Sequence, residues 1–290
     1  MSNILIIGAA GANGQATLKA LFAKADLNDH IIAGVRSEEK ARALKNLYPQ
    51  LETRVFDIEH ANELNAAMQG VDKVFYIPGN IEPRELHAKA VVDAALAHDT
   101  VKDFVFYSVF GAEYEGILFA RQFRYGEKLL EDSRLNWTHL RTIFFQDNLL
   151  GWAEDVKNGT LHLGTGKGRF APLLIQDIGD IAANILTSQG HAGKAYNITG
   201  PELISGAEIA EIFANELGKS VSHISPDNAT TLGALTGSGW PEWQAKGMVE
   251  LFNAFADDQA AMVSPDGELL LGRPLTPLKA FVKANKASFA

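Results

Sequence analysis

Three glycines at a regular spacing are the first residues in this sequence that suggest chemistry. Gly8, Gly11 and Gly14 stand in the segment GAAGANG, with the spacing G-x-x-G-x-x-G. Glycine permits a sharp turn, lets backbone approach a pyrophosphate without a Cβ in the way, and lets a helix pack closely on a strand. Free N–H groups at the start of a following helix would face the phosphates. The spacing favours a dinucleotide site, and the alternative is a turn without a ligand.

The residue after the second predicted strand bears on which dinucleotide fits. Arg36 stands there, where a chain that prefers NAD usually has Asp or Glu for the ribose 2′-hydroxyl. A guanidinium matches a 2′-phosphate in charge and geometry. We therefore favour NADP(H) over NAD(H), and the alternative for Arg36 is a solvated surface arginine. Asp57, at the end of the third predicted strand, could accept from an adenine amino group or cap the following helix.

Lys128 and Tyr125 are the candidates for assisting a reduction. The nicotinamide would supply the hydride, so the protein has to orient the acceptor and supply a proton or stabilise negative charge. A partly desolvated lysine near the cofactor can do both. A salt bridge to Glu131 or Asp132 is the alternative for Lys128. An ordinary half-buried tyrosine is the alternative for Tyr125. The eight histidines show no H-x-x-x-H spacing, so we predict no metal site.

An alternating framework of strands and helices must position these residues. Apolar runs separated by helical patterns predict strands over residues 4–7, 30–35, 53–58, 73–77, 104–108 and 137–141. This alternation predicts an α/β fold with a doubly wound parallel Rossmann sheet, whose ligands lie beyond the carboxyl ends of the strands. Pro78 and Gly79 follow the fourth strand, where a nicotinamide ribose would pass.

The second half of the sequence is less regular. We expect a hairpin or loop over residues 159–168, short strands over residues 194–199 and 221–224, and helices over residues 175–186 and after Ser205, Pro241 and Pro277. Residues 1–150 would form the NAD(P)-binding domain. Residues 151–290 would form a smaller α/β substrate-capping region, with the substrate in the cleft between the two. The two would be interleaved, with strands near residues 170 and 195 returning to the main sheet.

The amino-acid composition argues against several classes of protein. The 290 residues, 47% hydrophobic and 21% charged, are typical of an ordinary globular protein. A net charge of −9 argues against nucleic acid as a partner. The sequence has no cysteine, which excludes disulfides and thiol catalysis and fits a cytoplasmic location. We see no membrane-spanning run and no signal peptide.

Over nearly its whole length the sequence resembles the NmrA-like atypical short-chain dehydrogenases/reductases. The resemblance rests on the glycine turn and on the stretches GVRSEEKA, EKLLEDSRLNWTHLR, FFQDNL, DIGDIAANIL, GKAYNITGPELISGAEIAEIFANELGK and LLGRPLTPLKAFV. The family includes NADPH-dependent quinone and azo-compound reductases, isoflavone reductases, festuclavine dehydrogenases and redox-sensing regulators. The resemblance implies NADPH-dependent transfer of hydride to a small quinone-like, azo or enone/imine substrate. The alternative is a non-catalytic NADP(H) sensor that acts through a protein partner.

The resemblance also implies roles for individual residues in cofactor binding. The adenosine phosphates would be held by Gly8, Gly11, Ala12, Asn13, Gly14 and Arg36. Asp57 would lie by the adenine, and the segment of Ile77, Pro78 and Gly79 would line the ribose. Lys128 matches the family's lysine at the nicotinamide ribose.

Further residues would lie near the nicotinamide and the substrate. They are Phe144, Phe145 and Asn148, although the two phenylalanines could equally be a core pair at a strand end. Phe110, in the loop after the fifth strand, is a further substrate-binding candidate. The expected partner is a small molecule, and a homodimer stays open.

One departure from the mainstream family weakens the mechanism that it implies. Mainstream short-chain dehydrogenases place a Tyr four residues before the Lys and a Ser on the preceding strand. Here Arg124 stands four residues before Lys128, and Tyr125 stands only three before it. Ser108 does end the fifth predicted strand, so half of that arrangement persists. We keep all three of Ser108, Tyr125 and Lys128 as catalytic candidates.

Overall fold

The computed structural model describes residues 1–290 and divides the chain into two compact units. The first unit consists of Met1–Glu113, Ala120–Arg141 and Ile175–Asn197. The second consists of Tyr114–Phe119, Thr142–Leu174 and Ile198–Ala290. Each unit therefore collects segments that are separated in the sequence. Every helix of the chain is either too short or too polar to span a bilayer.

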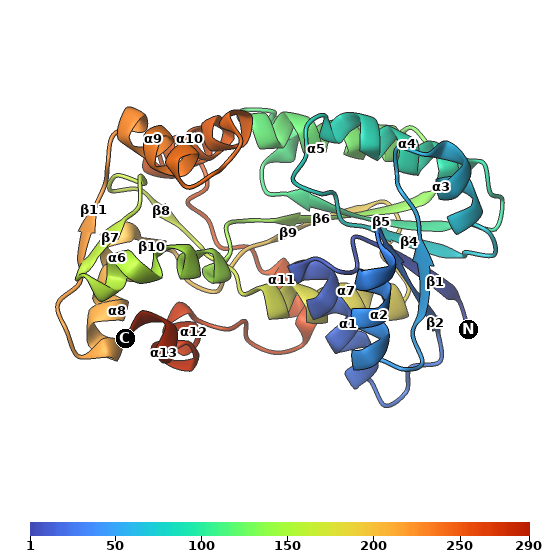
Figure 1. The fold of residues 1–290 in the computed structure, drawn as a ribbon, viewed down its shortest axis with the longest axis horizontal. Coiled ribbons are helices and arrows are strands. Elements are labelled where there is room, and N and C mark those ends of the chain that lie inside the picture. Colours follow the sequence, from blue (N-terminus) through green and yellow to red (C-terminus); the bar gives the residue numbers. More distant parts are fainter. The chain divides into compact units, whose positions relative to one another are not determined.

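A seven-stranded sheet forms the centre of the first unit (Figure 1). Its strand order is β3-β2-β1-β4-β5-β6-β9, so the direction of winding reverses between β1 and β4. The pairs β1–β2, β2–β3, β1–β4 and β4–β5 are parallel. The strands are β1 (Asn3–Ile7), β2 (His30–Val35), β3 (Glu52–Val55), β4 (Lys73–Tyr76), β5 (Asp103–Val109), β6 (Asn136–Thr142) and β9 (Lys194–Ile198). This is the predicted doubly wound Rossmann sheet, which is confirmed.

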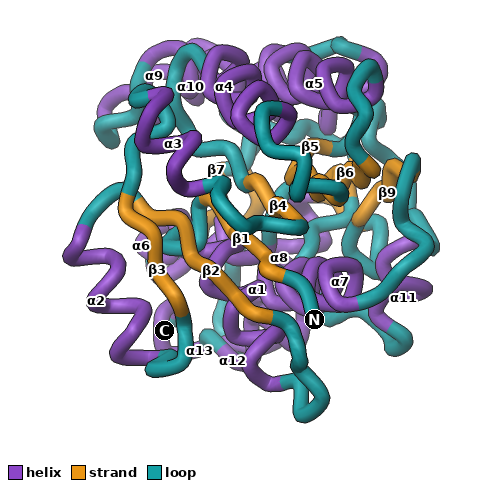
Figure 2. Tube along the Cα trace, turned by 90° about the vertical axis from the view of Figure 1, so that its right-hand side faces the viewer, coloured by secondary structure: helices purple, strands orange, loops and turns teal.

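Helices cover both faces of this sheet, as Figures 1 and 2 show. One face carries α1 (Ala12–Ala23), α2 (Glu38–Leu47) and α7 (Ile175–Thr187). The other carries α3 (Ala61–Ala67), α4 (Arg84–Leu96) and α5 (Leu118–Glu131). A short 3₁₀ helix, η1 (Ala112–Tyr114), follows β5. A Cβ at Gly179 of α7 would lie 2.5 Å from the carbonyl carbon of Ala16 in α1, so these two helices meet backbone to backbone.

Both faces of a parallel sheet are buried, so its strands are continuous apolar runs. The strands therefore lie where these runs predicted them. Ile4, Leu5 and Ile6 of β1 are completely buried, as are Phe75 of β4 and Phe104 of β5. The strand expected near residue 195 is β9, which joins the main sheet next to β6. β3 ends at Val55, earlier than expected, so Asp57 lies beyond the strand rather than at its end.

The second unit contains two small two-stranded sheets. β7 (Thr160–His162) pairs in parallel with β11 (Ser222–Ile224), and β8 (Arg169–Phe170) pairs antiparallel with β10 (Ile204–Ser205). The expectation that a strand near residue 170 returns to the main sheet is therefore wrong. The hairpin considered for residues 159–168 is also absent, because the partner of β7 lies about sixty residues later in the chain.

Helices make up most of the second unit. They are η2 (Gln146–Trp152, a 3₁₀ helix), α6 (Ala153–Lys157), α8 (Gly206–Leu217), α9 (Asn228–Gly237), α10 (Glu242–Ala256), α11 (Asp266–Leu271), α12 (Leu278–Ala284) and α13 (Lys286–Phe289). α8 begins with the predicted capping box between Ser205 and Glu208 and ends at Gly218 in the left-handed conformation. We did not predict η2, α6, α9, α11 or α13. α9 buries only Thr231, so its sequence has no apolar stripe to reveal it.

Candidate functional site

The turn after β1 needs glycine at two positions. Gly8 has φ +90°, and a Cβ on it would lie 2.7 Å from the carbonyl oxygen of Ile77. A Cβ on Gly14, in the first turn of α1, would lie 2.4 Å from the carbonyl oxygen of Gly8. Both distances are far below any real contact of a Cβ. In this turn the backbones of the strand, the loop and the helix are therefore in direct contact, as in a dinucleotide-binding fingerprint.

Gly11 serves a different purpose, because the space beside it is open. It is the N-cap of α1 and is exposed, and a Cβ on it would meet only the carbonyl oxygen of Gly8, at 3.4 Å. No side chain caps the helix. The first N–H groups of α1 therefore have no side-chain acceptor and lie beside an exposed, positively polarised helix end. This arrangement fits an anionic pyrophosphate.

Arg36 and Asp57 come together beyond the ends of β2 and β3. Nη2 of Arg36 lies 3.4 Å from Oδ2 of Asp57, and the Arg36 side chain is 64% exposed. The N–H of Glu59 donates to Oδ1 of Asp57 at 3.0 Å. This bond, and then the one from Arg36, hold the pKa of Asp57 below its usual value. The alternative considered for Asp57, that it caps the next helix, is wrong, because the N-cap of α3 is His60.

A buried arginine holds the segment after β4. Nε of Arg84 donates to the carbonyl oxygen of Gly79 at 3.1 Å, and Nη1 donates to Oε1 of Gln122 in α5 at 2.5 Å. The guanidinium also lies over the ring of Phe123, 4.6 Å from its centroid. Burial lowers the pKa of Arg84 to about 10, so the side chain stays charged at neutral pH. The bond from Arg84 thus holds the backbone at Gly79.

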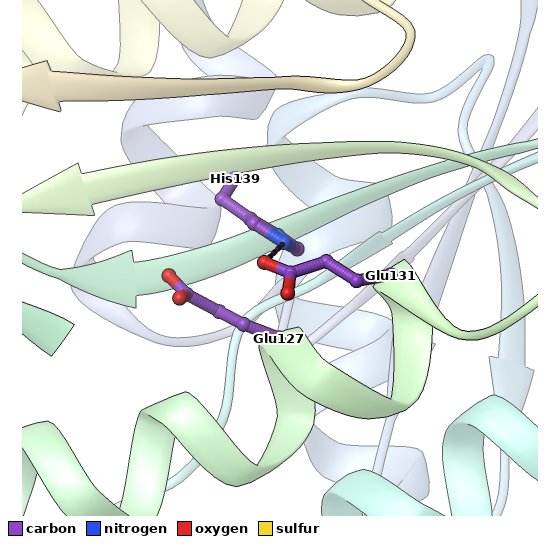
Figure 3. A group of neighbouring side chains, drawn as sticks. All are labelled: Glu127, Glu131 and His139. Atoms are coloured by element: carbon purple, nitrogen blue, oxygen red, sulfur yellow. Dashed lines mark ion pairs between the residues drawn. The ribbon is translucent and has the colours of Figure 1, made fainter. Parts of the chain in front are cut away.

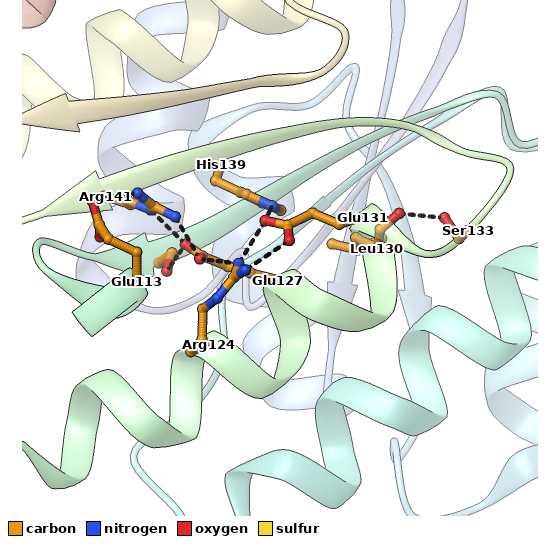
Figure 4. Close-up of polar contacts among 9 residues, drawn as sticks. Glu113, Arg124, Glu127, Leu130, Glu131, Ser133, His139 and Arg141 are labelled. Carbon is orange, nitrogen blue, oxygen red and sulfur yellow. Dashed lines mark hydrogen bonds and ion pairs between the residues drawn. The ribbon is translucent and has the colours of Figure 1, made fainter. Parts of the chain in front are cut away.

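A buried ion network joins α5 to β5 and β6 (Figure 4). Glu127 accepts from Nε and Nη2 of Arg141, each at 2.8 Å, and from the Ser108 hydroxyl at 2.7 Å. Arg124 donates to Glu127 at 3.0 Å and to Glu131. Ser108 and Glu127 expose no surface. Ser108 is therefore corrected from a catalytic candidate to a member of this network, because its hydroxyl already serves a buried carboxylate.

Glu127, Glu131 and His139 approach one another as metal ligands could (Figure 3). One ligand atom from each lies within 4.8 Å of the others. Both carboxylate oxygens of Glu127 are already bound by Arg124 or Arg141. A cation would have to displace a guanidinium and would meet its charge. We therefore assign no metal to this group, and the absence of a metal site stays a prediction.

His139 completes the network as a neutral side chain. It is buried and stacks on Trp137 with ring centroids 4.4 Å apart, and its Nε2 lies 3.4 Å from Oε1 of Glu131. Burial, which outweighs the nearby carboxylates, lowers the pKa of His139 to about 4. The imidazole is therefore uncharged at neutral pH.

Lys128 and Tyr125 lie on the face of α5 that points away from the sheet. Lys128 is exposed, and Tyr125 is 39% exposed. The buried face of the same helix carries Phe123, Glu127 and Leu130. Successive residues of a helix are turned by about 100°, so the first two cannot share that face. The structure does not bring either of them together with Ser108, and their catalytic roles stay predictions.

Phe144 is the other predicted site residue that the structure moves into the core. It is 5% exposed and contacts the rings of Trp152, Phe170, Phe252 and Phe255. Of the two alternatives considered, the core residue is the correct one for Phe144, and its cofactor role is withdrawn.

The remaining candidates for substrate keep some accessible surface. Phe145 is half-buried and forms an isolated parallel bridge with Leu173. Asn148 is exposed, and Phe110 is half-buried in the loop after β5. Phe145 and Asn148 belong to the second unit and Phe110 to the first.

Three side chains that organise this region were not predicted. A signal existed for Glu127, because Arg124, Glu127 and Glu131 recur at helical spacing on one face. Arg84 and Tyr107 gave none. Arg84 binds Gln122, 38 residues away, and the Tyr107 hydroxyl donates to Oδ1 of Asn13, 94 residues away, at 3.0 Å. Contacts over such separations leave no local pattern.

Comparison with known proteins agrees with this geometry. Residues 8–188 match the NAD(P)H-binding family. The chain is 31% identical to NAD(P)H azoreductase of Xenophilus azovorans over 288 residues, which cover 99% of both chains. The chain is therefore an NAD(P)H-dependent oxidoreductase with a small-molecule substrate. It belongs to the NAD(P)H-binding family.

Solved structures show the same fold over almost the whole chain. NADPH-dependent quinone oxidoreductase QOR2 of Escherichia coli, in complex with NADPH, matches with a TM-score of 0.89 and 26% identity. This match covers 98% of this chain and 99% of that one. NmrA, a negative transcriptional regulator, matches with a TM-score of 0.77 over 97% of this chain and 94% of that one. Its 14% identity shows the fold alone.

Proposed function

We propose that this protein is an NADP(H)-dependent reductase of a small conjugated acceptor, of the quinone-like, azo or enone/imine class. The observation that carries the proposal is the open turn at Gly11 together with Arg36, a cation where NAD-dependent enzymes have an acid. The azoreductase and the quinone oxidoreductase among the similar proteins support the acceptor class.

The proposed cofactor site lies in the first unit. The pyrophosphate binds at the turn, the 2′-phosphate at Arg36, the adenine beside Asp57 and the nicotinamide ribose beside the segment after β4. The residues that hold it are Gly8, Gly11, Ala12, Asn13, Gly14, Arg36, Asp57, Ile77, Pro78 and Gly79. NADPH supplies a hydride when bound. Phe110, Phe145 and Asn148 are the proposed contacts of the substrate.

The side chains available as proton donors also support a quinone-like or azo acceptor. Reduced quinones and azo compounds are weaker bases than the alkoxide from a ketone, so they need less acid catalysis. The burial of Ser108 and the outward position of Lys128 support a reaction in which the acceptor takes its proton from solvent. A ketone, which needs the Ser–Tyr pair, is the less suitable substrate.

The test is NADPH oxidation, followed at 340 nm, against a panel of quinones, azo dyes and enones. NADPH binding is titrated in parallel by the change in its fluorescence. We expect turnover with at least one quinone or azo acceptor and none with simple ketones. Tight binding without turnover across the panel would contradict the proposed acceptor class and favour the redox sensor. That sensor would be pursued by capturing partners in NADPH and in NADP⁺.

Three broader features of the chain are also proposals. The proposed division has a cofactor-binding region, residues 1–150, and a substrate-capping region, residues 151–290, and the substrate contacts Phe110, Phe145 and Asn148 belong to the first of these. The location is proposed as cytoplasmic, supported by the absence of cysteine and testable by cell fractionation. A homodimer is the third proposal. Analytical ultracentrifugation measures this assembly.

A further inference from the structure

A hydrogen bond joins the end of β5 to the beginning of α1. The hydroxyl of Tyr107 donates to Oδ1 of Asn13 at 3.0 Å, across 94 residues of sequence. Tyr107 is 5% exposed, and its ring packs against Phe75 of β4 with centroids 6.5 Å apart. A buried ring on a central strand is held rigidly, so it can fix the side chain that it binds.

Asn13 is held on its other side by its place in the helix. It is the second residue of α1, and its carbonyl oxygen accepts from the hydroxyl of Thr17 at 2.8 Å. The side chain is half-buried, and its amide nitrogen makes no hydrogen bond within the protein. Because Tyr107 engages the amide oxygen, the two amide hydrogens point away from Tyr107 and are offered as donors.

The charge of a pyrophosphate makes such a donor useful at this turn. No lysine or arginine occurs between Gly8 and Leu18, so the turn has only backbone N–H groups and polar side chains to offer. Hydrogen bonds from neutral donors to an anion are stronger than those between neutral groups. A donor already in place also costs less side-chain ordering on binding.

We propose that Tyr107 is a positioning residue that fixes the Asn13 amide as a donor to the cofactor pyrophosphate. The proposal rests on the proposed NADP(H) function. Tyr107 does not touch the cofactor in this arrangement. It acts by choosing which end of the Asn13 amide faces the ligand, and without it the oxygen can turn toward the phosphates and repel them.

The first experiment measures NADPH binding to the full chain carrying Tyr107→Phe, Asn13→Ala or both. Each single change is expected to weaken binding about tenfold, the effect of losing one hydrogen bond to a charged group. The double variant is expected to bind no worse than Asn13→Ala, since both act through one bond. Tyr196→Phe is the matched control, because it removes another bonded tyrosine hydroxyl, 2.9 Å from His191, at the far edge strand β9.

A second ligand separates positioning from general damage. Adenosine 2′-monophosphate carries the 2′-phosphate but neither phosphate of the pyrophosphate, so its affinity for Tyr107→Phe is expected to match that for the unchanged protein. Equal losses for both ligands, or additive losses in the double variant, would overturn the positioning role. Failure of the unchanged protein to bind NADPH at all would instead remove the proposed function.

A third variant keeps the test decisive if Asn13→Ala folds poorly. Asn13→Asp is nearly isosteric and places a negative charge in the first turn of α1, where it stabilises the helix. We expect its melting temperature to be maintained while NADPH binding falls by more than tenfold, because the carboxylate repels the pyrophosphate. Unweakened NADPH binding to Asn13→Asp would show that this side chain does not face the phosphates.

Discussion

Ser108 donates its hydroxyl hydrogen to Oε1 of Glu127 at 2.7 Å, and neither side chain exposes any surface. Arg124, which stands where mainstream relatives have their catalytic tyrosine, donates to the same carboxylate at 3.0 Å. Both positions that could supply a proton in a mainstream enzyme thus converge on one buried anion. The reaction centre of this protein must therefore be built differently.

Glu127→Gln should strongly destabilise the fold. Glu127 compensates the charges of Arg141 and Arg124, and the amide would leave both guanidinium groups without that partner. Breaking a buried pair in this way costs about 3–5 kcal/mol. Urea unfolding followed by circular dichroism measures the free energy of unfolding.

The matched control for this change is Glu154→Gln. Glu154 pairs with Lys157, but its side chain is 81% exposed. Surface pairs contribute about 0–1 kcal/mol, so this change should have little effect. Similar losses in both variants would mean that the network does not stabilise the protein.

Stability should fall between pH 6.5 and pH 4 because of His139. Its pKa is lowered by burial from 6.5 to about 4, so the unfolded chain binds a proton that the folded chain rejects. The contribution is complete above pH 6.5 and is lost as the pH falls toward 4. The difference in pKa corresponds to about 3 kcal/mol.

His139→Leu should flatten this part of the stability profile, measured by urea unfolding at a series of pH values. A smaller dependence of the free energy of unfolding on pH should remain, since burial also lowers the pKa of His191. His98→Gln, which removes a histidine from outside the network, should leave the profile as steep as before. An unchanged slope in His139→Leu would show that His139 is not the titrating group.

Two glycines of the first turn should respond to substitution in opposite ways. Gly14→Ala places a Cβ 2.4 Å from the carbonyl oxygen of Gly8, so α1 must shift and stability should fall by about 2 kcal/mol or more. The Cβ of Gly11→Val would meet only one atom, at 3.4 Å, so the fold should survive while the side chain fills the open side of the turn and NADPH binding is lost. Thermal melting and NADPH titration separate the two effects.

Gly151→Ala is the control for both glycine variants, because no atom lies within 4 Å of its Cβ position. It should change neither melting nor binding. Intact NADPH binding in Gly11→Val would mean that the open side of the turn is not where the cofactor lies.

Lys128→Ala should change turnover by less than about twofold, since an exposed side chain on the outer face of α5 takes no part in proton transfer. Steady-state NADPH oxidation at saturating acceptor measures the effect. Lys45→Ala, near the end of α2, is a comparable change of charge away from α5. A drop of more than about tenfold for Lys128→Ala alone would place it in the reaction centre.

The sequence predicted the parts of this site that depend on local pattern. The runs that form β1, β2 and β5 are apolar because parallel strands are buried on both faces. Gly8 and Gly14 could be recognised because their backbone contacts lie within the strand–turn–helix unit or directly beside it. The capping box of α8 is likewise complete within four residues.

The parts that could not be predicted depend on orientation or on distant partners. Lys128 and Glu127 are neighbours in sequence, yet one is exposed and the other completely buried. Only the packing of α5 against the sheet decides which of them faces inward. In the same way, Phe144 and Phe145 were equivalent in the sequence, and the ring cluster around Phe144 distinguishes them. β8 was misplaced because its partner strand is only two residues long.

Arg36→Gln should weaken NADPH much more than NADH. The guanidinium is 64% exposed and held only by a 3.4 Å contact with Asp57, so it is available to a 2′-phosphate. We expect the Kd of NADPH to rise about tenfold or more, and that of NADH to change by less than about twofold. Arg42→Gln, on the exposed side of α2, is the control for loss of one positive charge and should affect neither Kd. Equal weakening of both cofactors by Arg36→Gln would remove the 2′-phosphate from this residue, and the preference for NADP(H) would then need another source.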